Sequence, residues 1–472
     1  MTNQLASFVL IALLVLSGGL PQPSFAQSYE PTWASLDSRP TPDWFADAKF
    51  GIFVHWGVYS VPSWAPVGQQ EVPFWAQYAE WYWYRTAISA DSIPEHAPFI
   101  AYHEQRYGDE VQYQDFAPQF TAEMYDPTEW ADLFKQAGAK YVVLTSKHHE
   151  GFCLWPSAYS WNWNSQTIGA HRDLAGDLSE AVKEAGLKMG FYYSLYEWFH
   201  PLYQNEIERY VDAHLLPQMK ELVTAYEPDI LWADGEWEQA DTTWRSQEFL
   251  TWLFNESSVK DKIAINDRWG KDSRLRHGGY YTTEYDELAG GNASVLDSHV
   301  WEECRGIGTS FGYNRNENLE DYASSEALVH KLIGTVAQGG NLLLNVGPTA
   351  DGRIPVIMQQ RLMDIGTWLE TNGEAIYGSR KWSAGNQAGT DSTIYYTQKG
   401  KDLYVIGTQY PGRGERIRIN GIGKPASAQL LGVADKVSYQ TKAGTLTLQL
   451  PDLQPNQASP YAWVIRLEGA VL

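Results

Sequence analysis

The sequence predicts an α/β fold: a (β/α)8-like barrel domain followed by a small antiparallel β-sandwich domain. Between residues 50 and 371, short apolar runs alternate with amphipathic helical segments, which is typical of a parallel sheet covered by helices. Past Gly373 the helical pattern stops, and short strands separated by Gly and Pro indicate an antiparallel sandwich. We therefore assign residues 27–380 to the barrel and residues 381–472 to the sandwich.

Length and composition limit the possible classes of function. The chain has 472 residues, 44% of them hydrophobic, enough for a substantial core. Its net charge of −22 disfavours nucleic acid, whose phosphates need a basic partner, and also disfavours anionic membranes. The 21 tryptophans and 29 tyrosines suit a core, but they also suit sugar binding, in which aromatic faces pack on pyranose C–H surfaces.

Residues 1–26 resemble a secretory signal peptide. They hold an apolar segment, Phe8–Leu16, and small residues, Ser24 and Ala26, before the expected cleavage site. We expect export to a periplasmic, secreted or other extracytoplasmic location, with no membrane contact after cleavage; an uncleaved anchor is the alternative. The two cysteines predict no disulfide framework, and their spacing leaves one bridge between them open.

The predicted barrel begins with a strand at residues 50–57. Residues 58–118 lack a periodic segment, so we expect long loops with short helices there. Asp126, Pro127 and Glu129 then open a helix as N-cap, first and third residues. The remaining strands are expected at 141–145, 189–194, 229–233, 263–268 and 341–347, and the helices at 175–185, 205–225, 245–257, 324–337 and 356–371.

Polar residues stand where several of these strands end. In a barrel of this type the carboxyl ends of the strands meet at one mouth, so these residues should converge there. The most informative is Asp234, which follows an apolar strand that would not otherwise accommodate a carboxylate. A carboxylate on a rigid strand end beside indole rings suits a sugar-cleaving site. A doubly wound α/β fold is the alternative, but no Gly-rich phosphate turn follows the first strand.

Eight motifs resemble, in the same order, those of the α-L-fucosidases of glycoside hydrolase family 29. The resemblance is close over residues 30–380, and the trailing β domain is similar in kind. It implies a retaining, metal-independent hydrolysis of terminal α-L-fucose, with no cofactor. The motifs are Phe50–Gly57, Glu80–Tyr82, Lys147–Phe152, Tyr192–Ser194, Trp232–Gly235, Asn266–Gly270, Ser310–Asn314 and Asn341–Pro348.

Retaining hydrolysis needs two carboxyl groups about 5 Å apart. The resemblance implies that Asp234 is the nucleophile; a structural Asp capping the next turn is the alternative. The acid/base is Glu284 by resemblance to bacterial members, with Glu302 as the alternative. Glu236 is a lesser candidate, or a group that modulates Asp234, since two residues along a strand it would share the face of Asp234 some 6–7 Å away.

The same motifs imply a sugar pocket. Trp81, Trp232 and Phe311 would form an apolar wall against the C5 methyl group of fucose. Adjacent histidines on a strand point to opposite faces and chelate one ion poorly, so we expect no metal. Glu150 stands where the family often has Asp, and we expect it to support the site. The expected sugar-binding residues are His55, Glu80, Trp81, His148, His149, Tyr193, Trp232, Arg268 and Phe311.

The sequence thus predicts an exported retaining exo-α-L-fucosidase that acts on a fucosylated oligosaccharide or polysaccharide through a covalent fucosyl-enzyme. The alternatives are a non-catalytic fucose-binding protein on the same scaffold, an inverting hydrolase and a transfucosidase. A Gly-x-Ser-x-Gly elbow and a Walker loop are both absent, which disfavours acyl and phosphoryl transfer. The linkage cleaved and the oligomeric state stay open.

Overall fold

The computed structural model describes residues 28–68, 74–286, 293–382, 394–410, 416–434, 437–442, 444–452, 457 and 459–472. The expected signal peptide lies outside these ranges. Eight strands of the first domain form one sheet in the order β5-β4-β3-β2-β1-β8-β7-β6. These strands are β1 (Phe50–Val54), β2 (Tyr141–Lys147), β3 (Lys188–Ser194), β4 (Ile230–Asp234), β5 (Ala264–Ile265), β6 (Tyr281–Glu284), β7 (Trp301–Gly306) and β8 (Asn341–Val346).

Every paired strand in this sheet is parallel to its neighbour. The sheet curls until its two edges meet. There the amides of Gly279 and Tyr280, just before β6, donate hydrogen bonds to the carbonyls of Asn266 and Ile265 at the end of β5 (3.0 Å each). The predicted barrel is therefore confirmed, with an irregular seam between β5 and β6.

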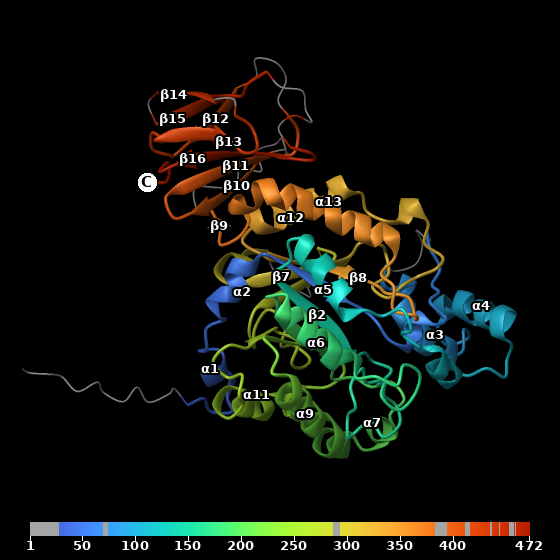
Figure 1. Cartoon of the computed structure of the whole chain (residues 1–472). Helices are drawn as coiled ribbons and strands as arrows, with labels where there is room; N and C mark the ends of the chain where they lie inside the picture. The colour runs from blue at the N-terminus through green and yellow to red at the C-terminus, as the bar shows by residue number, and fades with distance from the viewer. Residues whose placement is uncertain are drawn as a thin grey trace, which may run out of the picture.

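Helices cover the outside of this curled sheet (Figure 1). The Asp126 side chain caps α5 by accepting from the amides of Thr128 and Glu129, as the sequence predicts. The helix expected at 205–225 is instead broken into α7, α8, a π-helical turn at Val211–Leu215, and α9. The helices are α1 (Trp33–Leu36), α2 (Asp43–Ala48), α3 (Tyr82–Ala87), α4 (Ala97–Tyr107), α5 (Pro127–Gln136), α6 (Leu174–Glu184), α7 (Pro201–Asn205), α8 (Ile207–Tyr210), α9 (Leu216–Tyr226), α10 (Asp241–Trp244), α11 (Ser246–Asn255), α12 (Ser325–Ala337) and α13 (Val356–Asn372).

Two apolar layers hold the barrel together. A large layer lies between the sheet and the helices, and a smaller one fills the inside of the barrel. Inside, Phe53, Tyr192 and Trp232 lie just below the mouth, and the ring of Phe45 from α2 stacks on Tyr280 at a centroid distance of 4.0 Å. The interior is thus filled with aromatic side chains up to the level of the strand ends.

The C-terminal domain is a sandwich of two antiparallel sheets, in the orders β13-β16-β11-β10-β9 and β12-β15-β14. Its own apolar core lies between them. Figure 1 shows it stacked on α12 and α13. The strands are β9 (Arg380–Lys381), β10 (Ile394–Lys399), β11 (Asp402–Gly407), β12 (Ile417–Asn420), β13 (Ser427–Leu430), β14 (Ser438–Lys442), β15 (Thr445–Gln449) and β16 (Trp463–Glu468).

Cys153 and Cys304 are both buried and carry free thiols, so the bridge left open by the sequence is not formed. Within the described ranges, no helix combines the length and the apolar character needed to cross a bilayer.

Candidate active site

A cavity of about 240 Å³ opens at the carboxyl ends of the barrel strands. That volume lies below the ~300–1,000 Å³ typical of pockets for drug-sized ligands, and it suits one monosaccharide. Its walls carry aromatic rings together with carboxylates, imidazoles and one guanidinium. The lining residues are Phe53, His55, Trp75, Tyr78, Glu80, Trp81, His148, His149, Tyr192, Trp232, Asp234, Trp237, Arg268, Glu284, Cys304 and Phe311.

Asp234 is the last residue of β4 and lies at the mouth. The chain turns sharply at Gly235, which has φ +73°. A Cβ there would also lie 2.6 Å from Cβ of Tyr196, so a side chain is excluded on two grounds. The turn ends the strand at Asp234 and lets the next carboxylate, Glu236, leave the cavity.

Both oxygens of the Asp234 carboxylate accept hydrogen bonds. Arg268 donates from Nη1 to Oδ1 (2.7 Å), and the hydroxyl of Tyr192 donates to Oδ2 (2.8 Å). Burial alone would raise the pKa of Asp234, but the positive charges of Arg268 and Arg274 outweigh it and hold the pKa below its ordinary value. Asp234 is therefore an anion with fixed orientation.

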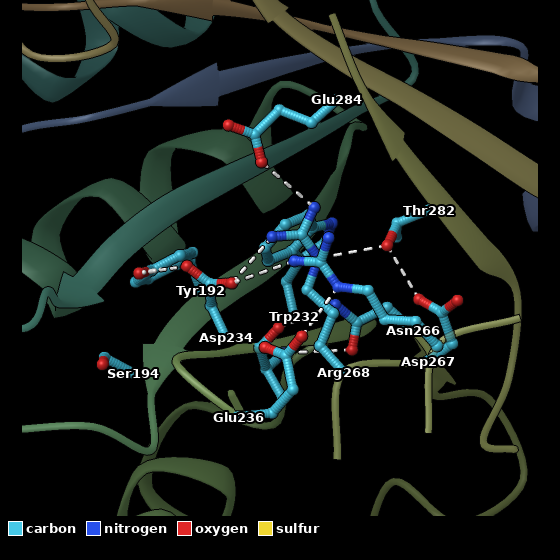
Figure 2. Close-up of polar contacts among 12 residues, drawn as sticks. Tyr192, Ser194, Trp232, Asp234, Glu236, Asn266, Asp267, Arg268, Thr282 and Glu284 are labelled. Atoms are coloured by element: carbon cyan, nitrogen blue, oxygen red, sulfur yellow. Dashed lines mark hydrogen bonds and ion pairs between the residues drawn. The ribbon is translucent and has the colours of Figure 1, made fainter. Parts of the chain in front are cut away.

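Arg268 connects the two predicted catalytic carboxylates. Its second terminal nitrogen, Nη2, lies 3.3 Å from Oε2 of Glu284, so one guanidinium contacts both acids (Figure 2). The guanidinium also lies 4.3 Å above the ring of Trp232, and its Nε donates to the hydroxyl of Thr282 (3.1 Å). These contacts fix the plane of the guanidinium and with it the relative positions of the two carboxylates.

Glu284 ends β6 at the rim of the cavity. It is more exposed than Asp234, and its Oε1 accepts a hydrogen bond from the hydroxyl of Tyr78 (3.1 Å). A carboxyl group at the rim can reach both a leaving group and incoming water. The structure thus brings Asp234 and Glu284 together on one cavity, as the sequence predicts.

Glu302, the alternative acid/base, lies elsewhere. It is fully buried inside the barrel on β7 and does not line the cavity. Its Oε2 accepts from the hydroxyl of Tyr141 (2.5 Å), and its Oε1 accepts from the indole of Trp232 (2.9 Å). Burial raises the pKa of Glu302 to about 7. Its contacts are those of a support beneath Trp232.

Glu236 is also turned away from the cavity. Its Oε1 accepts from Nε of Arg274 at 2.7 Å, and burial raises its pKa. Arg274 in turn places Nη2 3.8 Å from Oδ1 of Asp234. The sequence predicted that Glu236 shares the face of Asp234 on a continuing strand, which is wrong because the strand ends at Asp234 and the chain turns at Gly235.

Hydrogen bonds fix the tautomers of two cavity histidines. Asn345 donates from its Nδ2 to the carbonyl of Phe311 (2.7 Å), so its Oδ1 must accept from Nδ1 of His55 (2.7 Å). Burial, with nearby His148, lowers the pKa of His55 to about 3, so the ring is neutral and its Nε2 is an acceptor.

His149 is fixed in the same way. Ser194 donates to the carbonyl of Tyr196 (2.6 Å), so its hydroxyl oxygen accepts from Nδ1 of His149 (2.6 Å). Burial lowers the pKa of His149, and its Nε2 lies 3.8 Å from Oδ2 of Asp234. Both histidines therefore offer an acceptor nitrogen to a hydroxyl-rich ligand.

The other predicted wall residues also meet at the cavity. Oε2 of Glu80 accepts from the hydroxyl of Ser310 (3.1 Å) and from the amide of Gly312 (2.8 Å). Nδ1 of His148 lies 3.4 Å from Oε2 of Glu150, which itself lies outside the lining, in agreement with the supporting place expected for it. Trp81, Trp232 and Phe311 supply apolar surface.

Tyr193 does not reach the cavity. It lies on the outer face of β3, where its hydroxyl donates to Gln218 (2.8 Å) and accepts from Nζ of Lys147 (3.2 Å). The register of β3 with β4 pairs Tyr192 with Trp232 and Tyr193 with Ala233. Since neighbouring residues on a strand face opposite sides, Tyr192 takes the place predicted for Tyr193.

The sequence interpretation missed several cavity residues. Side chains alternate between the two faces of β3, and the face shared with Trp232 and Asp234 of β4 is the one that carries Tyr192. This could have identified Tyr192, but only with the register between β3 and β4 known. Tyr78 and Trp75 come from the aperiodic segment 58–118, whose path has no local signal. The missed residues are Phe53, Trp75, Tyr78, Tyr192, Trp237 and Cys304.

One group in the described part of the chain has the composition of a metal site: Glu197, His200 and His214. It lies outside the cavity lining. Nζ of Lys147 lies 3.3 Å from Oε1 of Glu197, and Nε2 of His214 lies 3.1 Å from its Oε2. The carboxylate is thus already neutralised by an ammonium, which opposes a second cation.

Comparison with known proteins identifies the family of the chain. The Alpha-L-fucosidase family profile matches residues 20–374, and the Alpha-L-fucosidase C-terminal domain profile matches residues 387–468. The tissue alpha-L-fucosidase of Homo sapiens is 42% identical, over 99% of this chain and 98% of that protein. The Alpha-L-fucosidase of Branchiostoma floridae is 44% identical, over 97% of this chain and 99% of that protein.

Solved structures agree with these relatives. The alpha-fucosidase of Thermotoga maritima in complex with fucose superposes with a TM-score of 0.77 at 38% identity, over 94% of this chain and 100% of that chain. Both domains are thus matched in sequence, and nearly the whole chain is matched in fold. The chain belongs to the α-L-fucosidase family of glycoside hydrolases.

Proposed function

We propose that this protein is a retaining exo-α-L-fucosidase that removes terminal α-L-fucose from fucosylated glycans. The observation that carries the proposal is the placing of Asp234 and Glu284 on the two terminal nitrogens of Arg268, facing one cavity. Retaining glycosidases need a short separation between their carboxyl groups, and a shared guanidinium supports it. A cavity for one monosaccharide supports cleavage at a chain end.

In the first step Asp234 attacks the anomeric carbon of the bound fucose. A covalent β-linked fucosyl-enzyme forms, the glycosidic bond breaks, and Glu284 donates its proton to the departing oxygen. Because Arg268 and Tyr192 hold the attacking carboxylate on both oxygens, it needs little reorganisation to reach the anomeric carbon.

In the second step Glu284 takes a proton from a water molecule. The water attacks the anomeric carbon from the opposite face and releases α-L-fucose and free Asp234. Glu284 suits this exchange because it lies at the rim, where the leaving group departs and water enters. Glu302 lacks that access, since it is fully buried and binds Tyr141 and Trp232.

The sugar hydroxyls would be bound by the neutral histidines and Glu80. Nε2 of His55 and of His149 would each accept a hydrogen bond from a sugar hydroxyl, and Oε1 of Glu80 would accept another. The rings of Trp232 and Phe311 offer apolar surface to the C5 methyl group. We also propose that the N-terminal segment, residues 1–26, directs export of the protein.

The stereochemistry of hydrolysis tests this proposal. With an aryl α-L-fucoside and continuous NMR detection, we expect the α anomer of fucose to appear first and to mutarotate afterwards. If the β anomer appears first, the enzyme is inverting. If the fucoside binds but is not cleaved, the protein is a fucose-binding protein. Added methanol or galactose that captures most of the fucose as a new glycoside would indicate a transfucosidase.

A further inference from the structure

Two tryptophans at the mouth of the cavity differ from the other aromatic residues that line it. Trp75 and Trp237 are 52% and 37% exposed, whereas Trp232, Phe53 and Phe311 are buried. Exposed indole surface costs free energy in water, and it commonly marks a binding site when it borders a cavity. The inner wall and the rim of the same cavity therefore offer different surfaces to a ligand.

Trp237 is held next to the predicted nucleophile. It follows Asp234 by three residues, after the turn at Gly235. Its ring centroid lies 5.3 Å from that of His149 and 6.2 Å from that of Trp81. One edge of the indole is thus packed, and the rest faces solvent at the rim.

Trp75 is held by a buried cation. The guanidinium of Arg85 lies 5.2 Å from the ring centroid of Trp75 and 5.5 Å from that of Trp81, and its Nη2 donates to the carbonyl of Trp75 (3.4 Å). Arg85 is itself buried. The orientation of this rim residue is therefore tied to the inner wall, although the indole is half exposed.

The size of the cavity decides what must lie at this rim. About 240 Å³ takes one monosaccharide, so the unit attached to a bound fucose has to lie outside, against the rim. Hexopyranoses have one face made of C–H groups, and such faces pack on indole rings. Two exposed indoles that line the same cavity as Asp234 are placed to bind that face.

We propose that Trp75 and Trp237 form the binding site for the leaving-group sugar, a hexopyranose such as a galactoside. The inference rests on the function proposed above, since it concerns the second sugar of the same substrate. Binding at this site adds to transition-state affinity for a sugar leaving group and adds nothing for a leaving group without a ring.

The test compares two substrates that share fucose and differ in the leaving group. One is a fucosyl-galactose disaccharide and the other is α-L-fucosyl fluoride, which carries no second sugar. For Trp75→Ala and for Trp237→Ala we expect kcat/KM to fall about tenfold with the disaccharide and to stay within about twofold with the fluoride. Trp237→Phe, which keeps a ring, should regain part of the loss.

Trp161 provides a matched control. It is 89% exposed and does not line the cavity, so Trp161→Ala should leave both substrates unaffected. Equal losses with the disaccharide and the fluoride would overturn the inference, because the tryptophans would then support the fucose pocket. Unchanged values with both substrates would overturn it as well. If the wild-type protein cleaves neither substrate, the proposed function itself fails.

Discussion

At the scale of single residues, Arg268 organises the charges of the site. Its guanidinium is buried between Asp234 and Glu284 and lies on the ring of Trp232. Removal of one partner from such a buried ion pair is strongly destabilising, because it leaves an uncompensated charge. The same contacts that orient the two acids therefore also keep Asp234 ionised in a place where burial would favour protonation.

Glu302 is a second buried acid, and its protonation differs from that of Asp234. Its pKa is raised from 4.5 to about 7, so the folded state favours the neutral form. Below about pH 4.5 the side chain is protonated in both states and costs nothing. As the pH rises to 7, the unfolded state loses the proton first, and the folded state is destabilised by ~3 kcal/mol relative to low pH.

We therefore predict that Glu302→Gln reduces the loss of stability between about pH 4.5 and pH 7. Relative to the wild type, the variant should gain up to ~3 kcal/mol across this window, measured by denaturant unfolding at several pH values. It should keep most of its activity, because Gln still offers an acceptor to Trp232. A difference that does not change with pH would show that the pKa of Glu302 is the same in the folded and the unfolded state. A loss of activity restored by azide would return it to the acid/base role.

At the scale of elements, the alternation of β3 separates two adjacent tyrosines. Tyr192 donates to Asp234 inside the barrel, while Tyr193 donates to Gln218 under the helices. A hydrogen bond to a charged group contributes ~1.5–3 kcal/mol. The two hydroxyls should therefore affect different properties of the protein.

Tyr192→Phe should lower kcat/KM on an aryl fucoside by about 10- to 100-fold, because Asp234 loses one of its two donors. Tyr193→Phe should leave kcat/KM within about twofold and lower the free energy of unfolding by ~1–3 kcal/mol, since Gln218 loses a buried partner. Kinetics and denaturant unfolding on both variants separate these effects. The reverse assignment, with Tyr193→Phe as the inactive variant, would mean that the register of β3 is different.

This pair also shows how far the sequence predicts the site. The strand ending at Asp234 and the cap at Asp126 follow from local rules, and the structure confirms both elements. The choice between Tyr192 and Tyr193 does not follow from local rules. Both faces of a parallel strand are buried, so the polarity of the residues does not indicate which of them face the inside of the barrel. Residues 58–118 are loops and short helices as predicted, but the positions of Trp75 and Tyr78 depend on tertiary packing.

The sequence also does not predict how deep each of the two candidate acids lies within the barrel. Glu284 and Glu302 are both carboxylates on strands near the seam, and nothing in the local sequence says which one ends its strand. β6 ends at Glu284, whereas Glu302 is the second residue of β7. Strand ends are set by pairing with neighbours, so the rim position of one acid and the interior position of the other appear only in the folded barrel.

At the scale of the whole molecule, the sandwich is joined to the barrel through α12 and α13. The indole of Trp368 on α13 donates to the carbonyl of Ala462 (2.9 Å), and Nδ2 of Asn372 donates to the hydroxyl of Ser459 (2.9 Å). Residues of β11 and β16, including Ile406 and Val464, belong to the same apolar layer as the barrel helices. The two domains should therefore unfold as one cooperative unit.

Trp368→Ala tests this coupling. The substitution leaves a cavity in the shared layer and an unpaired carbonyl, so we expect a loss of ~3–5 kcal/mol in the free energy of unfolding and little change in KM. Calorimetry should show a single transition at lower temperature. Two transitions in the wild type, with one unaffected by the substitution, would show that the sandwich is stable independently of the barrel.

The central claim is that Asp234 is the nucleophile, and the configuration of a rescued product tests it most directly. For Asp234→Gly we expect a fall in kcat of about 10³-fold or more with an activated aryl α-L-fucoside, and renewed turnover with azide. Azide then attacks in place of the missing carboxylate, so NMR should identify β-L-fucosyl azide. Glu284→Ala keeps the covalent intermediate and should give the α azide instead. If Asp234→Gly hydrolyses the fucoside at the wild-type rate, or if its product with azide is α-L-fucosyl azide, the assignment is contradicted.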